Sequence, residues 1–246
     1  MRNNLINLPN DDIDTFYRSH HCDTYVENKA TRRSFKETME RATKPGEVFY
    51  MDVQGPFQTQ SLEGHKYIVG FIDSFSRRCF TYYTDRRNKV PDIFINQFYP
   101  NILTPCIDNN LSGGHAKVIS DNGEFKCIRM EVFCNSNKIK QYFTCPYTPE
   151  HNAPIERVFR ALGNMCNTML REKELDVDLW EYAHETAVYI YNRLPRRNIK
   201  QEGTKSPEEM FYGIKPSLKH VRIFGSKAFV HISEQTRLKN HLPKAV

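Results

Sequence analysis

Short apolar stretches separated by polar turns predict three consecutive β-strands in the first part of the chain. Only turn-length segments separate these stretches, so we expect an antiparallel meander. The three stretches are "EVFYMDVQGPF" (residues 47–57), "HKYIVGFIDSFS" (residues 65–76) and "RRCFTYYTD" (residues 77–85). The first strand is expected to stop at Gly55-Pro56, because these residues interrupt a strand.

Helical periodicity becomes more frequent after the meander and predicts alternating helices and strands. Helices are expected over residues 91–103 (where Pro100 limits the helix), 128–137, about 153–174 and about 178–193, and strands over residues 116–121 and 139–145.

The carboxyl-terminal part begins with a strong helix start. In "SPEEMFYG", Ser206 is the expected N-cap, Pro207 follows at the first helical position, and Glu209 lies three residues after the cap. The preceding segment "RRNIKQEGTK" is expected to be a basic loop, and "HVRIFGSKAFVHI" (residues 220–232) one or two further strands.

Three antiparallel strands followed by helix, strand, helix, strand and helix is the element order of a ribonuclease-H-like fold. We therefore predict an α/β fold with a mixed five-stranded sheet and helices on both faces. The predicted organisation is an amino-terminal arm (residues 1–44), a core (residues 45–195), and a basic linker with a carboxyl-terminal extension (residues 196–246).

Composition supports a folded chain and limits the classes of protein. Hydrophobic residues make up 39% of the 246 residues, which is enough for a packed core. No apolar run is long enough to cross a membrane, and "MRNNLINLPNDD" lacks the apolar stretch of a signal peptide. We expect an intracellular protein, nuclear and cytoplasmic, without a membrane partner. The seven cysteines are irregularly spaced without a CxxC pair, so we expect reduced thiols.

Positive charge is concentrated near the carboxyl end. Residues 193–246 contain 12 Lys and Arg against 4 Asp and Glu, although the net charge of the whole chain is only +6. A basic segment of this kind suits a polyanion such as nucleic acid, and it is equally compatible with a solvated basic surface.

Three carboxylates are candidates for chemistry. Asp52 lies inside the first strand, where a buried carboxylate needs a partner, a metal ion or access to a cleft. Asp121 ends the strand 116–121, and Glu156 lies near the start of the longest helix. Taken singly, the aspartates could cap turns. Glu156 could belong to a solvated face or pair with Arg160 one turn on.

The predicted topology brings these three residues together. The first and fourth strands would be neighbours, so Asp52 and Asp121 would lie side by side, and the helix that begins near Glu156 could close over them. Three converging carboxylates repel one another unless cations bind between them. Because hard oxygen ligands suit hard cations, Mg²⁺ or Mn²⁺ is the expected occupant.

The sequence resembles the integrase region of copia-type retrotransposon Pol polyproteins, over about residues 22–246. The resemblance depends on several motifs in the family's order: "MDVQGPF", "KYIVGFIDSFSR", "ISDNGEF", "TCPYTPEHNAPIERVFR", "DLWEYAHETAVYIYNRLP", "SPEEMFYGIKPSLKHVRIFGSKAFVHI" and "RLKNHLPKAV". It implies a ribonuclease-H-like core with an Asp, Asp, Glu triad at Asp52, Asp121 and Glu156. It also implies two metal ions that support 3′-end processing of element DNA and strand transfer into target DNA, by a homo-oligomer.

The sequence departs from the family pattern in three places. Cys22 occupies the first cysteine position of the family's zinc module, but Tyr25 stands at the second, so we expect no structural zinc. The turn between Gly123 and Glu124 is one residue shorter than usual, which leaves 34 residues between Asp121 and Glu156. Ala153 replaces the family's usual Gly.

These departures leave a second hypothesis open: a decayed or domesticated derivative that binds nucleic acid or protein without catalysis. A simple ribonuclease H is a third, disfavoured by the integrase-type helices and tail. Trp180, Tyr182 and Tyr189 are expected in the core rather than stacked on bases. The residues expected to contact DNA are Asn122, His151, Asn152, Arg157 and Arg160 near the triad, and Arg193, Arg196, Arg197 and Lys200 farther away.

Overall fold

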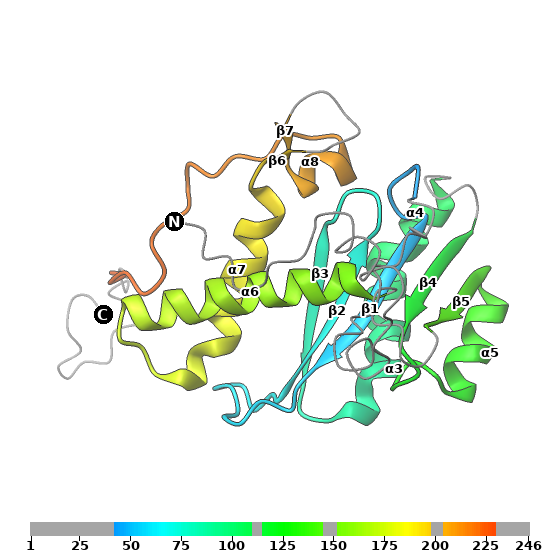
Figure 1. Cartoon of the computed structure of the whole chain (residues 1–246), viewed down its shortest axis with the longest axis horizontal. Coiled ribbons are helices and arrows are strands. Elements are labelled where there is room, and N and C mark those ends of the chain that lie inside the picture. Colours follow the sequence, from blue (N-terminus) through cyan, green and yellow to red (C-terminus); the bar gives the residue numbers. More distant parts are fainter. Residues whose placement is uncertain (1–41, 110–114, 145–151, 198–203, 230–246) are drawn as a thin grey trace, which may run out of the picture. The chain divides into compact units, whose positions relative to one another are not determined.

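The computed structural model describes residues 42–109, 115–144, 152–197 and 204–229 (Figure 1). The chain divides into two units, residues 1–38 and 39–246, and every described residue belongs to the second unit. The sequence positions predicted as a remnant zinc module, from His20 to Tyr25, lie outside the described residues.

The centre of the second unit is a mixed five-stranded sheet with the order β3-β2-β1-β4-β5. β1 pairs antiparallel with β2, and β2 with β3, whereas β4 runs parallel to β1 and β5 parallel to β4. The predicted fold class is thus confirmed, and so is the expectation that the first and fourth strands are neighbours. The strands are β1 (Val48–Gln54), β2 (Tyr67–Asp73), β3 (Cys79–Thr84), β4 (Ala116–Ser120) and β5 (Ile139–Phe143).

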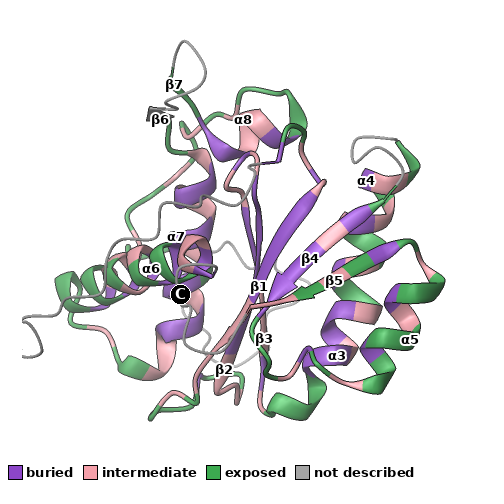
Figure 2. Cartoon of the chain, turned by 45° about the vertical axis from the view of Figure 1, so that its right-hand side comes forward, coloured by how far each residue is buried: buried purple, intermediate pink, exposed green. Residues whose placement is uncertain are grey.

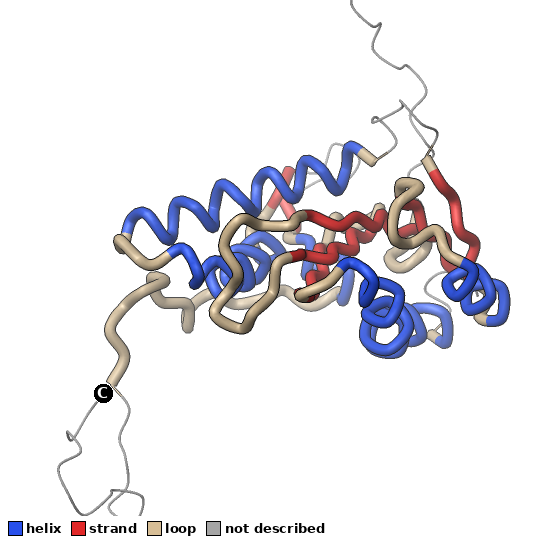
Figure 3. The backbone as a smooth tube through the Cα atoms, turned by 90° about the horizontal axis from the view of Figure 1, so that it is seen from below, coloured by secondary structure: helices blue, strands red, loops and turns tan. Residues whose placement is uncertain are grey.

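Helices cover both faces of this sheet (Figure 3). On one face lie α6 (Ala153–Glu172) and α7 (Trp180–Arg193), the latter preceded by the 3₁₀ turn η4 (Val177–Leu179). The other face is covered by a helical region that begins at the 3₁₀ turn η1 (Arg87–Lys89) and by α5 (Ile128–Ser136). Both long helices on the first face lie where their periodicity predicts them.

Alternation along the strands divides the apolar residues between two cores. Phe49 and Met51 of β1 face the core that contains α5, whereas Tyr50 faces the core that contains α6 and α7. Successive strand residues point to opposite faces, so burial on both faces leaves a continuous apolar run in β1. Figure 2 shows the buried residues gathered along these central strands.

The helical region after β3 is longer than predicted. It comprises α3 (Val90–Ile93), the π-helix η2 (Phe94–Leu103) and α4 (Thr104–Asp108), and it passes through Pro100 without stopping. Proline lacks the N–H that an α-helix needs at this position. The wider π-helical hydrogen-bond pattern accommodates Pro100, and Phe94, Phe98 and Leu103 remain buried.

The carboxyl-terminal region agrees with the predicted cap and differs in its strands. Ser206 Oγ accepts a hydrogen bond from the Glu209 N–H at 3.2 Å and caps α8 (Pro207–Tyr212) as expected. The predicted strands over residues 220–232 are wrong for the described residues 220–229, which contain a turn at Phe224-Gly225 and no strand. Ile223 and Phe229 are 70% and 79% exposed there, so no neighbouring strand pairs with this apolar stretch.

The predicted basic loop before α8 instead begins and ends in a small sheet. Its two strands, β6 (Arg196–Arg197) and β7 (Thr204–Lys205), pair antiparallel. Four of the five cysteines in the described residues are buried. Within the described ranges, no helix combines the length and apolar character that crossing a membrane requires.

Helix α6 rests directly on the sheet at Gly70 of β2. A Cβ atom placed on Gly70 would lie 2.5 Å from Cζ of Phe159 and 3.5 Å from Cδ1 of Ile155, both on α6. Gly70 is also the cross-strand partner of Asp52. The missing side chain therefore allows α6 to approach the sheet beside that carboxylate.

We expect Gly70→Ala to lower the free energy of unfolding by about 1–3 kcal/mol, because the new methyl group overpacks the contact with Phe159. Urea denaturation measures the change. The matched control is Gly163→Ala on α6, where an added Cβ meets nothing within 4 Å. The control should raise stability by about 0.5–1 kcal/mol, as expected for glycine replaced within a helix. Equal stability of Gly70→Ala and wild type would contradict the close approach.

Candidate active site

Asp52 is placed by the register of the central strands. It lies on the same side of β1 as Tyr50, facing the core that contains α6. The side chain is partly buried, and its Oδ1 accepts a hydrogen bond from the Val53 N–H at 2.8 Å. Asp52 is thus a carboxylate held near the carboxyl end of a central strand, where α/β proteins place their sites.

Asp121 follows β4 directly and is in register with Asp52. The parallel pairing of β1 and β4 matches Tyr50 with Ile119, and two more residues along each strand lead to Asp52 and Asp121. The Asp121 Oδ1 accepts a hydrogen bond from the Gly123 N–H at 3.0 Å, so this carboxylate also caps its own turn. A Cβ on Gly123 would lie 2.9 Å from that oxygen, which explains why a glycine fits the shortened turn.

Glu156 projects from the first turn of α6. Its neighbour Ile155 is fully buried, and Phe159 one turn on packs against Gly70, so the start of this helix is fixed on the sheet. Glu156 itself is exposed. Ala153, which replaces the family's usual Gly, is the first residue of the helix.

The charges of these residues act on one another. Burial is the largest of the causes that together raise the pKa of Asp52 to about 7, and the hydrogen bond from Val53 opposes it. The negative charges of Asp121, Glu156 and Glu124 contribute to the same rise. These carboxylates are therefore close enough to disfavour the ionised form of Asp52, and a bound cation would relieve this repulsion.

The donor set fits a hard divalent cation by its chemistry, since it consists of carboxylate oxygens. Among the described residues, however, no three His, Cys, Asp or Glu side chains lie close enough together to hold a metal ion. Both observations are consistent if the exposed side chains of Asp121 and Glu156 close on a cation when it binds. The triad and its metal-binding role remain predictions.

Sequence reasoning missed the contribution of Glu124. Glu124 forms an ion pair with Arg87 of η1, with Arg87 Nε and Glu124 Oε1 3.0 Å apart. Its charge acts on Asp52 together with those of Asp121 and Glu156. The only signal in the sequence was its place in "DNGEF", because Arg87 is remote along the chain.

The residues predicted to contact DNA near the triad lie in different environments. Arg157 and Arg160 are exposed on α6. Among the described residues, neither of them forms an ion pair with Glu156, so the alternative in which Glu156 pairs with Arg160 is not observed. The amide of Asn122 donates to the Thr144 carbonyl at 3.1 Å and accepts from Lys126 Nζ at 3.1 Å.

Asn152 is buried at the N-cap of α6, where its Oδ1 has no hydrogen-bond partner among the described residues. His151 lies outside the described residues. The DNA contacts predicted for all these residues remain predictions.

The more distant predicted contacts are only partly described. Arg193 is 3.3 Å from Glu208 Oε1, and its guanidinium lies 3.6 Å from the centroid of the Tyr189 ring. Glu208 also binds Arg78 at 2.7 Å, so Arg193 belongs to an internal charge network. Arg196 and Arg197 form β6, and Lys200 lies outside the described residues.

Known proteins resemble this chain in sequence. Residues 42–149 match the integrase core domain. The chain is 32% identical over 219 residues to the retrovirus-related Pol polyprotein from transposon TNT 1-94 of Nicotiana tabacum. It is 28% identical over 219 residues to the corresponding polyprotein from transposon RE2 of Arabidopsis thaliana. Each match covers 89% of this chain but only 16% and 14% of the relatives, so the chain spans about one-sixth of their length.

Solved structures agree on the fold. A chain of the simian T-cell lymphotropic virus intasome, in complex with PP2A regulatory subunit B56 gamma, matches with a TM-score of 0.58 and 15% identity. That match covers 90% of this chain and 72% of the other. The HTLV-2 integrase catalytic core domain in complex with magnesium, in a trimeric form, matches with a TM-score of 0.50 and 16% identity, over 70% and 100% of the two chains.

The described fold is therefore shared with solved retroviral integrase structures, and residues 42–149 match the integrase core domain. The relatives are copia-type retrotransposon Pol polyproteins, so the resemblance seen in the sequence is confirmed.

The raised pKa of Asp52 predicts a pH-dependent gain in stability for Asp52→Asn. Between pH 4 and 7 the folded protein holds a proton on Asp52 that the unfolded chain, with a pKa of 3.8, releases. Wild type thus loses stability as the pH rises through this window, and Asn avoids the loss. In EDTA, we expect the advantage of the variant to grow to as much as about 4 kcal/mol near pH 7.

The free energy of unfolding measured by urea at several pH values checks this. Glu172→Gln, on the exposed last turn of α6, is the control and should show no comparable change. An Asp52→Asn advantage that is constant from pH 4 to 7 would be inconsistent with a buried, repelled carboxylate.

Proposed function

We propose that this chain is the integrase part of a retrotransposon Pol polyprotein and that Asp52, Asp121 and Glu156 form a metal-dependent active site. The reactions would be 3′-end processing of element DNA and strand transfer into target DNA. The observation that carries the proposal is the repulsion around Asp52. Carboxylates from the turn after β4 and from the first turn of α6 act on Asp52, the partly buried carboxylate of β1.

The residues of the chain supply binding and orientation. Asp52 is fixed on a rigid central strand, whereas Asp121 and Glu156 are exposed at the edge where a polynucleotide can approach. These carboxylates would hold a pair of Mg²⁺ or Mn²⁺ ions, which would activate a hydroxyl nucleophile and stabilise a leaving oxygen. Arg157 and Arg160, exposed beside Glu156, would contact the phosphates of the DNA.

The nucleophile decides between the two reactions. Water would release the 3′ end of the element, and the freed 3′-hydroxyl would then attack target DNA in an in-line displacement. The similar HTLV-2 core domain is described in complex with magnesium, which supports the proposed cation. A similar chain belongs to an intasome and another to a trimeric form, which supports a homo-oligomer acting on DNA. We propose that the protein acts in the nucleus and the cytoplasm, as this activity requires.

One observation favours a second candidate, a derivative that binds nucleic acid or protein without catalysis. Within the described ranges, no three potential metal-binding side chains converge on one point. The turn between Gly123 and Glu124, which is one residue short, orients the Asp121 side chain. A change in this turn would therefore keep the three carboxylates from converging. Metal binding separates the two candidates, because a non-catalytic derivative has no need of it.

Strand transfer with a labelled oligonucleotide in Mn²⁺ or Mg²⁺ tests the proposal. Glu156→Gln should lower the rate by at least about a hundredfold, because even residues that only orient metal ligands are worth 10–100-fold. Glu172→Gln on the same helix should retain the wild-type rate. Mn²⁺ should also raise the melting temperature of wild type more than that of Glu156→Gln. Wild type without metal-dependent activity, or Glu156→Gln as active as wild type, would refute the enzymatic function.

A further inference from the structure

A cavity of about 310 Å³ lies between α6, α7 and the loop that follows β1. Its walls include the buried side chains of Ile68, Leu170 and Trp180. The exposed amides of Gln58 and Asn167 also line it. An apolar interior with a few polar groups, in this range of volume, is typical of a small-ligand site.

The cavity is lined by a polar group that lacks a partner. His184 of α7 is 3% exposed, and its Nδ1 is 2.9 Å from the hydroxyl of Tyr83. The other ring nitrogen, Nε2, is buried and has no hydrogen-bond partner among the described residues. Burial lowers the pKa of His184 to about 4, so the ring is neutral at physiological pH. Either neutral tautomer leaves Nε2 able to make one more hydrogen bond.

The lining selects against charged ligands. Among the described residues, no Lys, Arg, Asp or Glu lines the cavity. A phosphate or a carboxylate would therefore enter without a counter-charge, at a high desolvation cost. Phe57 and Trp180, whose ring centroids are 4.7 Å apart, provide aromatic surface. The matching ligand is a neutral, planar ring with hydrogen-bonding groups on its edge.

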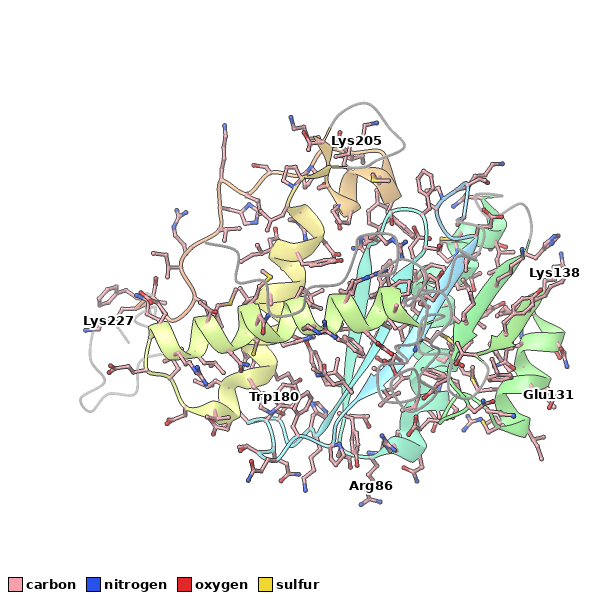
Figure 4. The ribbon with its side chains drawn as sticks, in the orientation of Figure 1. Arg86, Glu131, Lys138, Trp180, Lys205 and Lys227 are labelled. Carbon is pink, nitrogen blue, oxygen red and sulfur yellow. The ribbon has the colours of Figure 1, made fainter. Side chains whose placement is uncertain are left out.

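The cavity lies close to the candidate active site, so a molecule bound at that site could supply such a ring. Gln54 lines the cavity and lies on the same side of β1 as Asp52, two residues away. Gly163 and Asn167 line it from α6, at helical spacing from Glu156 along one face. Gly163 is about 10 Å from Glu156 along the helix axis, at 1.5 Å per residue. Figure 4 labels Trp180 at the start of the neighbouring helix α7.

We propose that this cavity binds an unpaired nucleobase of the DNA substrate, about three nucleotides from the reacting phosphate, given roughly 3.4 Å per nucleotide of a duplex strand. The inference rests on the proposed function in taking DNA as the substrate. Base edges carry acceptors and donors for the exposed amides of Gln58 and Asn167, and the aromatic rings contact the face of the base. The base could come from a frayed element end or from distorted target DNA.

Trp180 makes the proposal directly measurable, because it is the only tryptophan of the chain. Its fluorescence in the full-length protein should be quenched saturably when a base enters the cavity. Three duplexes of one sequence serve as probes: one with a single-stranded 5′ overhang, one with an internal bulged base, and one with flush ends. Quenching by the first duplex alone indicates the element end as the source, and quenching by the second alone indicates target DNA.

Gly163 offers a variant that fills the cavity without disturbing the core. An added Cβ at this position meets nothing within 4 Å, so Gly163→Leu should fold and extend into the cavity. We expect it to weaken the quenching interaction by about tenfold or more, which is the scale of one base stacked on an aromatic ring. Gly163→Ala is the matched control and should quench as wild type does. Binding of the flush-ended duplex, measured by fluorescence anisotropy, should stay within about twofold for both variants, because it carries no unpaired base for the cavity.

Three results would overturn the proposal: quenching as strong with the flush duplex, DNA binding without quenching, or Gly163→Leu that quenches like wild type. A separate titration with free nucleosides distinguishes this failure from failure of the proposed function. Nucleosides that quench wild type but not Gly163→Leu support the cavity even if strand transfer is absent. Strand transfer without any quenching would support the proposed enzymatic function and contradict the proposed base-binding cavity.

Discussion

The close approach of α6 to the sheet at Gly70 is the contact on which the rest of the site depends. Phe159 and Ile155 occupy the space that a side chain at Gly70 would need, and Gly70 is the cross-strand partner of Asp52. This packing fixes the first turn of α6 beside the central strand. Glu156 is therefore brought near Asp52 by steric fit, and not by any attraction between the two carboxylates, which repel each other.

That repulsion has a thermodynamic meaning. The fold holds Asp52 where burial and neighbouring charges raise its pKa, so the metal-free protein stores an unfavourable interaction at its candidate site. Strained or repulsive groups of this kind are typical of functional sites. A ligand that removes the repulsion binds more tightly, because the relief of repulsion adds to its binding free energy. The ion pair of Arg87 with Glu124 limits the excess negative charge at the edge of this cluster.

The five strands and the two long helices could be predicted from the sequence, because burial on one or both faces requires a periodic or continuous pattern of apolar residues. The sequence also indicated Asp52, Asp121 and Glu156, through strand ends and motif order. It could not predict contacts between remote segments, such as Gly70 with Phe159 or Arg87 with Glu124. The strands expected over residues 220–232 were wrong over 220–229 because an apolar alternation does not supply a pairing partner.

Helix α6 carries both Glu156 and the cavity-lining residues Gly163 and Asn167 on one rigid backbone. The separation between the candidate reaction centre and the cavity is therefore set by the rise of an α-helix, which side-chain substitutions do not alter. Helix α6 thus holds the two sites at a fixed distance from each other. The protein would select a substrate by the distance between its reacting phosphate and its unpaired base, as well as by its charge. Changing that distance would require adding or removing residues within the helix.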